Sequence, residues 1–90
     1  MLISGADDQL WPSNVYADRI MAVLRADPAR RIHLNYPAAG HDVFSFPYVP
    51  EVIEERESPG TVIDLGGTAA GDNAAHVSDW PAAIRFILAN

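Results

Sequence analysis

Two residues of this 90-residue sequence, an aspartate and a histidine, each follow a predicted strand on a short glycine-containing loop. Asp8 ends the turn that begins at Gly5, and His41 ends the loop that begins at Pro37. Neighbouring parallel strands end at one edge of a sheet, about 4.8 Å apart, so we expect the two side chains to meet there. A carboxylate that accepts from one imidazole nitrogen orients the ring and stabilises its protonated form. The pair therefore predicts the acid and the base of a catalytic triad.

The acidic side chains near this pair allow two alternatives to a catalytic pair of Asp8 and His41. Asp7 is the second candidate for the orienting acid, but a Gly-x-x-Asp pattern counted from Gly5 ends at Asp8. Asp7 is expected to cap the turn or to remain solvated. A metal cluster of Asp7, Asp8, His41 and Asp42 is the other alternative, and its spacing matches no standard ligand motif. We expect catalytic roles for Asp8 and His41, and neither a metal nor another cofactor.

A nucleophile for this triad is absent from the sequence. There is no Gly-x-Ser-x-Gly turn and no cysteine, and none of the five serines follows the pattern of a nucleophile elbow. In α/β-hydrolases the serine precedes the acid, and the acid precedes the histidine. The backbone amides of the oxyanion hole come partly from the same elbow. These residues alone are therefore expected not to turn over substrate.

Two strands and a helix between them must position the pair. Residues 1–4 are apolar and stop at Gly5, which predicts a buried strand. Residues 31–36 predict a second strand, with Ile32, Leu34 and Tyr36 on one face and His33 and Asn35 on the other. Between them, residues 13–25 predict an amphipathic helix that is capped by Ser13 and carries an apolar stripe of Tyr16, Ile20, Val23 and Leu24. A crossover of this kind implies parallel strands.

The second half of the chain predicts a long loop and a helix. Prolines and glycines interrupt residues 46–72, which we expect to form a lid or substrate-facing flap with at most one helical turn at residues 51–56. Its acidic cluster is expected to be solvated (Glu51, Glu54, Glu55 and Glu57). The closing helix starts near Ser78, or near Asn73 with a kink at Pro81. One side of it is apolar (Val77, Trp80, Ile84, Ile87 and Leu88). His33 and His76 are expected to be solvated, and Trp11 and Trp80 to pack.

Composition limits the partners. The chain has 12 acidic residues against 6 arginines, no lysine and a formal charge of −6. An acidic surface gains nothing from releasing counterions of nucleic acid or of anionic membranes, so we expect neither as a partner. No apolar run approaches the roughly 18 residues of a membrane span, and no basic signal segment opens the chain. With 49% apolar residues, a globular and cytoplasmic protein is expected.

Several motifs resemble one family. Residues 4–13 look like the acid loop of the acyl-CoA thioesterase and bile-acid-CoA:amino-acid N-acyltransferase family, and residues 36–41 look like its histidine loop. Residues 47–48, 66–68 and 74–86 are similar to other parts of the same pattern. The resemblance covers nearly the whole chain, and it corresponds to the C-terminal part of an α/β-hydrolase domain. It implies an α/β fold, incomplete as a domain, with two parallel strands, a crossover helix, a long loop and a C-terminal helix.

The resemblance also implies a reaction. An upstream Ser or Cys would attack an acyl-CoA thioester, His41 would act as base and then acid, and Asp8 would hold its ring. Phe46 and Tyr48 are expected to line the acyl channel or to pack the loop. An upstream hydrolase half is expected as a partner because the strand at residues 1–4 would otherwise have a bare edge, as in a truncated or split reading frame.

Two other functions stay open. One is a different α/β-hydrolase that acts on esters or lactones, since the acid turn and the histidine loop recur across that fold. The other is a non-catalytic remnant that binds a partner chain. The Gly66-Gly67-Thr68 motif and the pattern up to Trp80 favour the thioesterase family over a different hydrolase.

Overall fold

A parallel two-stranded sheet forms the centre of the molecule. The computed structural model describes residues 1–25, 27–50 and 52–90, without the side chains of residues 55 and 57. Strand β1 (Leu2–Gly5) pairs with β2 (His33–Tyr36) in parallel, with Leu2 opposite His33 and Gly5 opposite Tyr36. Helix α1 (Ser13–Val23) and the short 3-10 helix η1 (Pro28–Arg30) connect the two strands. The predicted strand–helix–strand crossover is therefore confirmed.

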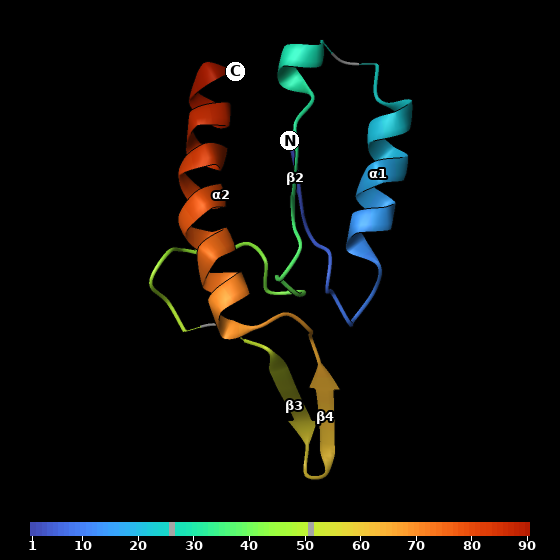
Figure 1. The fold of residues 1–90 in the computed structure, drawn as a ribbon, viewed down its shortest axis with the longest axis vertical. Coiled ribbons are helices and arrows are strands. Elements are labelled where there is room, and N and C mark those ends of the chain that lie inside the picture. Colours follow the sequence, from blue (N-terminus) through green and yellow to red (C-terminus); the bar gives the residue numbers. More distant parts are fainter. Residues whose placement is uncertain (26, 51) are drawn as a thin grey trace.

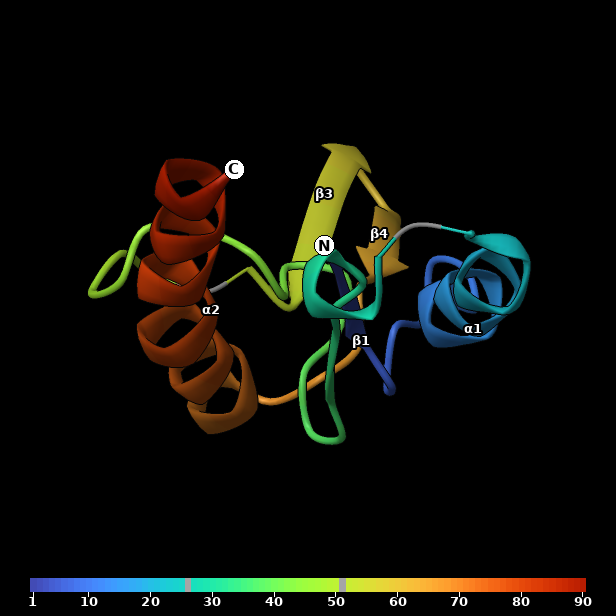
Figure 2. The ribbon, with the colours of Figure 1, turned by 90° about the horizontal axis from the view of Figure 1, so that it is seen from above.

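The two long helices lie on opposite sides of this sheet (Figures 1 and 2). Side chains along β2 alternate between the two helices, as the sequence predicts. His33 faces α1, where its Nδ1 lies 3.3 Å from a carboxylate oxygen of Asp18. Tyr36 faces the other way, and its hydroxyl donates to Ser78 Oγ of the C-terminal helix at 3.0 Å. The alternating polar and apolar faces of β2 thus decide which helix each side chain meets.

His33 is not solvated, contrary to expectation. Its Nε2 lies 2.7 Å from the buried hydroxyl of Ser4 on β1, and that hydroxyl donates to Asn35 Oδ1 at 2.9 Å. The face of the strands toward α1 therefore carries polar side chains that bond to each other: Ser4 is buried, His33 is half-buried and Asn35 remains exposed. The sheet face that looked solvent-facing in the sequence is partly covered.

Helix α1 packs through Ala17 and Met21, which lie beside the predicted apolar stripe, and not through the stripe itself. Its buried residue is Ala17, at 6% exposure, and the small side chain allows a close approach to the sheet. The predicted stripe is largely exposed, from 38% at Leu24 to 74% at Val23. Ser13 is also not the N-cap: Pro12 holds that position without a side-chain cap, and the Ser13 hydroxyl donates to the Gly5 carbonyl instead.

A β-hairpin occupies the middle of the predicted loop. Strand β3 (Glu54–Ser58) pairs antiparallel with β4 (Thr61–Asp64), and the hairpin projects away from the sheet and helices (Figure 1). The predicted helical turn is wrong over residues 54–56, while Glu51 lies outside the described residues. Gly60, at φ +83°, provides the positive backbone angle that the tight turn requires. The Pro59-Gly60 turn and the β-branched residues after it are the local signals for this hairpin.

Helix α2 (Ala69–Ala89) starts earlier than either predicted position, and Pro81 lies inside it. Thr68 caps it by accepting from the Gly71 amide at 2.9 Å. Its buried face is polar and small, and includes four fully or almost fully enclosed side chains (Asp72, Ala75, His76 and Asp79). His76 is therefore buried rather than solvated. The predicted apolar side is largely exposed, with Leu88 at 81%, and only Trp80 of that side is half-buried.

The small core lies where the strands end. Ala39, Val43 and Ala75 form it, and Ile3 and Tyr36 pack against it. This core joins the histidine loop to α2 and to the sheet, so it supports the loops that leave β1 and β2. In the part of the chain that is described, no helix is both long and apolar enough to cross a membrane.

Candidate active site

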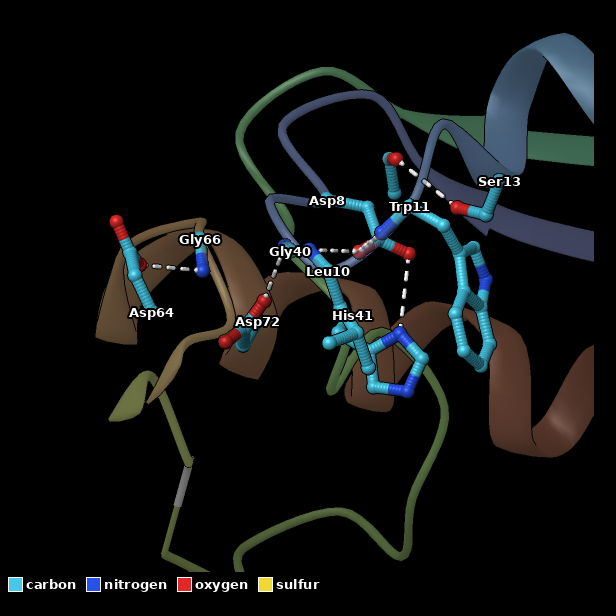
Figure 3. A network of polar contacts seen from close by, with 10 residues as sticks. Asp8, Leu10, Trp11, Ser13, Gly40, His41, Asp64, Gly66 and Asp72 are labelled. Atoms are coloured by element: carbon cyan, nitrogen blue, oxygen red, sulfur yellow. Dashed lines mark hydrogen bonds and ion pairs between the residues drawn. The ribbon is translucent and has the colours of Figure 1, made fainter. Parts of the chain in front are cut away.

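The structure brings Asp8 and His41 together at the carboxyl edge of the sheet. His41 Nδ1 lies 3.1 Å from Asp8 Oδ2 (Figure 3). The Asp8 side chain is only 2% exposed, whereas the His41 side chain is 32% exposed. Because Nδ1 faces the carboxylate, Nε2 is the ring nitrogen on the opposite side, where a reacting group can approach. The arrangement is that of an acid that orients a base.

Asp8 is held by its own turn. Its Oδ1 accepts from the backbone amides of Leu10 at 2.9 Å and Trp11 at 3.2 Å (Figure 3). Burial alone raises the pKa of Asp8, but hydrogen bonds from His41 and these two amides, together with the nearby Ser13 side chain, lower its pKa below the ordinary value. The carboxylate is therefore ionised at neutral pH, as an orienting acid must be. Ser13, expected as a helix cap, thus contributes to the site.

Residues 65–67 lie against both loops and join them. The His41 amide donates to the Leu65 carbonyl at 2.8 Å, and the Gly67 amide donates to Asp7 Oδ2 at 3.0 Å. Gly66 and Gly67 have φ near +75°, and a Cβ on Gly66 would lie 1.9 Å from the Asp7 carbonyl oxygen. Only glycine fits such a backbone and such a close approach. Asp7 therefore bonds across to this junction instead of capping its own turn, and it remains exposed, whereas Asp8 contacts the histidine.

Trp11 is a site residue that the sequence analysis assigned only to packing. Its ring meets the His41 ring edge-on, with centroids 4.7 Å apart and an angle of 89° between the planes. Figure 3 shows it beside the imidazole. The indole therefore covers one side of the base while remaining 49% exposed itself. Its position three residues after Asp8, within the same turn, was the available signal.

The aromatic residues after His41 lie along α2. Phe46 stacks at a tilt on Trp80, with ring centroids 4.4 Å apart, and Phe44 is 5.6 Å from the same indole. Phe46 is 59% exposed, and Tyr48, at φ +67°, is 85% exposed. None of the hydrogen bonds or ring contacts among the described residues joins Phe46 or Tyr48 to His41. Packing of the loop by Phe46 is observed, and contact with an acyl chain stays a prediction for both residues.

The alternative metal cluster is not assembled. Asp42 accepts from the Val52 amide at 2.8 Å, while Asp7 bonds to the Gly67 amide. Over the residues that the structure describes, no three His, Asp or Glu side chains are placed to hold a metal ion together.

Buried Asp79 on α2 leads to a prediction about stability. Burial raises its pKa from 3.8 to about 6, although His76 and the Trp80 amide act in the lowering direction. Between about pH 4 and 6 the folded protein retains a proton that the unfolded chain has released. Its free energy of unfolding therefore falls as the pH rises through this window, by at most about 3 kcal/mol. Asp79→Asn should abolish this contribution.

Urea titrations at several pH values would measure the effect. We expect the stability of the Asn variant relative to the parent to increase from pH 4 to 6 and then to level off. The titration of Asp8 does not affect stability in this pH range. Because the pKa of Asp8 is lowered in the folded protein, Asp8 contributes stability above its unfolded pKa, near 3.8. That stability is lost only as the pH falls below this value. Parallel curves for the two proteins would contradict the prediction.

A comparison with protein families gives one match. The sequence model described as BAAT / Acyl-CoA thioester hydrolase C terminal matches residues 1–89. A search among curated proteins found no significant match. The matched range includes the acid turn, the histidine loop and both long helices.

Proposed function

This chain belongs to the BAAT / acyl-CoA thioester hydrolase C-terminal family, and we propose that Asp8 and His41 are the acid and the base of a triad that cleaves acyl-CoA thioesters. The observation that carries the proposal is the 3.1 Å contact between a buried, ionised carboxylate and a partly exposed imidazole. An enclosed acid and an accessible base are what proton transfer to a substrate requires.

The reaction follows from this geometry. A Ser or Cys from outside these 90 residues attacks the thioester carbonyl while His41 Nε2 takes its proton. The C–S bond then breaks, and the imidazolium returns the proton to the departing CoA thiolate. Water, deprotonated by His41, next attacks the acyl-enzyme. The bond between the acyl carbon and the nucleophile then breaks, the imidazolium returns the proton to the Ser or Cys, and a carboxylic acid leaves. In an acyltransferase, an amino acid amine would replace the water. Asp8 remains ionised throughout and stabilises the imidazolium.

Three aromatic residues fit this reaction. Trp11 covers one side of the His41 ring, so it restricts the directions from which water reaches the base. Phe46 and Tyr48 are proposed to contact the acyl chain, because both are exposed and both lie on the loop that follows His41. A long acyl group would bury such rings with a gain of about 25 cal/mol per Å² of apolar surface.

The nucleophile is proposed to lie on a further hydrolase segment or chain that packs against this one. Exposed apolar surface supports that association, including Tyr16 and Ile20 on α1 and Ile87 on α2. We use the term assembled hydrolase for these 90 residues together with the segment or chain that carries the nucleophile. The DNA before the first codon is the first place to search for an in-frame Gly-x-Ser-x-Gly or Gly-x-Cys-x-Gly.

Release of free CoA thiol from long-chain acyl-CoA tests the proposal. The assembled hydrolase should release thiol, and these 90 residues alone should not exceed the uncatalysed rate, because they lack both nucleophile and elbow. Simple esters and lactones of matched chain length serve as comparison substrates. Faster cleavage of those compounds would replace the thioesterase proposal with the alternative hydrolase, and turnover by the 90 residues alone would contradict the assignment of the nucleophile.

A further inference from the structure

The backbone on both sides of His41 is attached to one face of α2. The Gly40 amide donates to Asp72 Oδ1 at 2.9 Å (Figure 3). His76 Nε2 lies 2.5 Å from the Asp42 carbonyl oxygen. Asp72 and His76 are four residues apart, so they lie one turn apart on the same face of the helix. The residues before and after His41 are thus each bonded to a side chain of α2.

Both helix side chains are completely buried. Asp72 and His76 have 0% exposure, whereas the His41 side chain between their bonding partners is 32% exposed. A carbonyl oxygen can only accept, so His76 Nε2 carries a proton and donates it. That bond is the one hydrogen bond of the His76 ring among the described residues, since Nδ1 has none there. The buried imidazole therefore serves the Asp42 carbonyl.

We propose that His76 is a positioning residue for His41: by holding the Asp42 carbonyl while Asp72 holds the Gly40 amide, it directs the His41 ring toward Asp8. A third bond, from the His41 amide to the Leu65 carbonyl at 2.8 Å, limits the remaining rotation. The inference rests on the proposed function of His41, and it adds a buried residue that does not contact substrate.

Three substitutions at position 76 distinguish a side chain whose donor reaches the Asp42 carbonyl from one that is merely polar and from one that is apolar. The amide nitrogen of Gln lies near the position of Nε2 and can still donate to the Asp42 carbonyl. The amide of Asn lies nearer to Nδ1 and falls short, and Leu donates nothing. In the assembled hydrolase we expect His76→Leu and His76→Asn to lower kcat by about 10- to 100-fold with KM unchanged, because a displacement of about 1 Å at a reacting group has such an effect. His76→Gln should stay within a few-fold of the parent.

Rates are to be expressed per folded, acylated active site, counted from the burst of CoA release, so that loss of folded protein does not imitate loss of positioning. A second readout is the downfield proton resonance of the His41–Asp8 hydrogen bond, which His76→Asn should weaken and His76→Gln should retain. Tyr36→Phe is the matched control: it removes the hydrogen bond to Ser78, another polar link between the sheet and α2, and should leave kcat unchanged.

The outcomes keep the two proposals apart. Equal kcat for the Gln and Asn variants, with the downfield resonance intact in both, would overturn the role of His76 alone. If His76→Leu fails to fold, the Gln and Asn pair still decides the question, because both variants keep a polar side chain. An assembled hydrolase that remains fully active after His41→Ala would instead overturn the proposed function.

Discussion

Replacing His41 by alanine in the assembled hydrolase is expected to lower kcat/KM for acyl-CoA by at least about 10³-fold. The imidazole accepts the proton of the nucleophile and returns one to the CoA thiolate, so both half-reactions lose their proton carrier. Binding of the CoA substrate should change little, because His41 contributes in the transition state rather than in the ground state. Steady-state thiol release, with the number of folded molecules measured in parallel, gives the ratio.

His33→Ala is the matched control for this variant. His33 also pairs with a carboxylate, that of Asp18, but it lies under α1 and contacts Ser4 there. The control should retain activity per folded molecule even if its stability falls. A His41→Ala enzyme within tenfold of the parent would show that another group carries the proton, and the proposed triad would have to be abandoned.

Asp8→Asn is expected to reduce kcat by about 10³- to 10⁴-fold without loss of the fold. The substitution keeps the size and the shape of the side chain. It removes the negative charge that stabilises the imidazolium, and the amide nitrogen can present a donor where Nδ1–H needs an acceptor. The Asp8 oxygen that accepts from the Leu10 and Trp11 amides has a counterpart in asparagine, so the turn should survive.

Asp7→Asn tests the choice between the two adjacent aspartates. Asp7 accepts from the Gln9 side chain through Oδ1 and from the Gly67 amide through Oδ2. The single amide oxygen of asparagine can keep the bond to the Gly67 amide, and only the exposed contact with Gln9 loses its acceptor. We therefore expect a change in kcat of no more than a few-fold, against the large loss at Asp8. The reverse pattern, with the larger loss at Asp7, would mean that the orienting acid has been wrongly assigned.

Local patterns in the sequence were enough for the elements that deliver the pair. The alternation in residues 31–36, the helical spacing after Ser13 and the glycine stops predict two parallel strands joined by a helix. Parallel neighbours necessarily end at the same edge, so the sequence alone predicts that Asp8 and His41 meet. These features depend on neighbours a few residues apart, which a sequence displays directly.

Tertiary structure decided which surfaces are buried. The sequence predicts a solvated His76 and places Asp72 in a loop. Both are enclosed instead, because their partners, the Asp42 carbonyl and the Gly40 amide, lie more than thirty positions earlier in the chain. The contact between Ser4 and His33 likewise joins segments that are distant in the sequence. Most buried polar side chains are hydrogen-bonded to a partner, and no local periodicity reveals a partner that lies far away in the sequence.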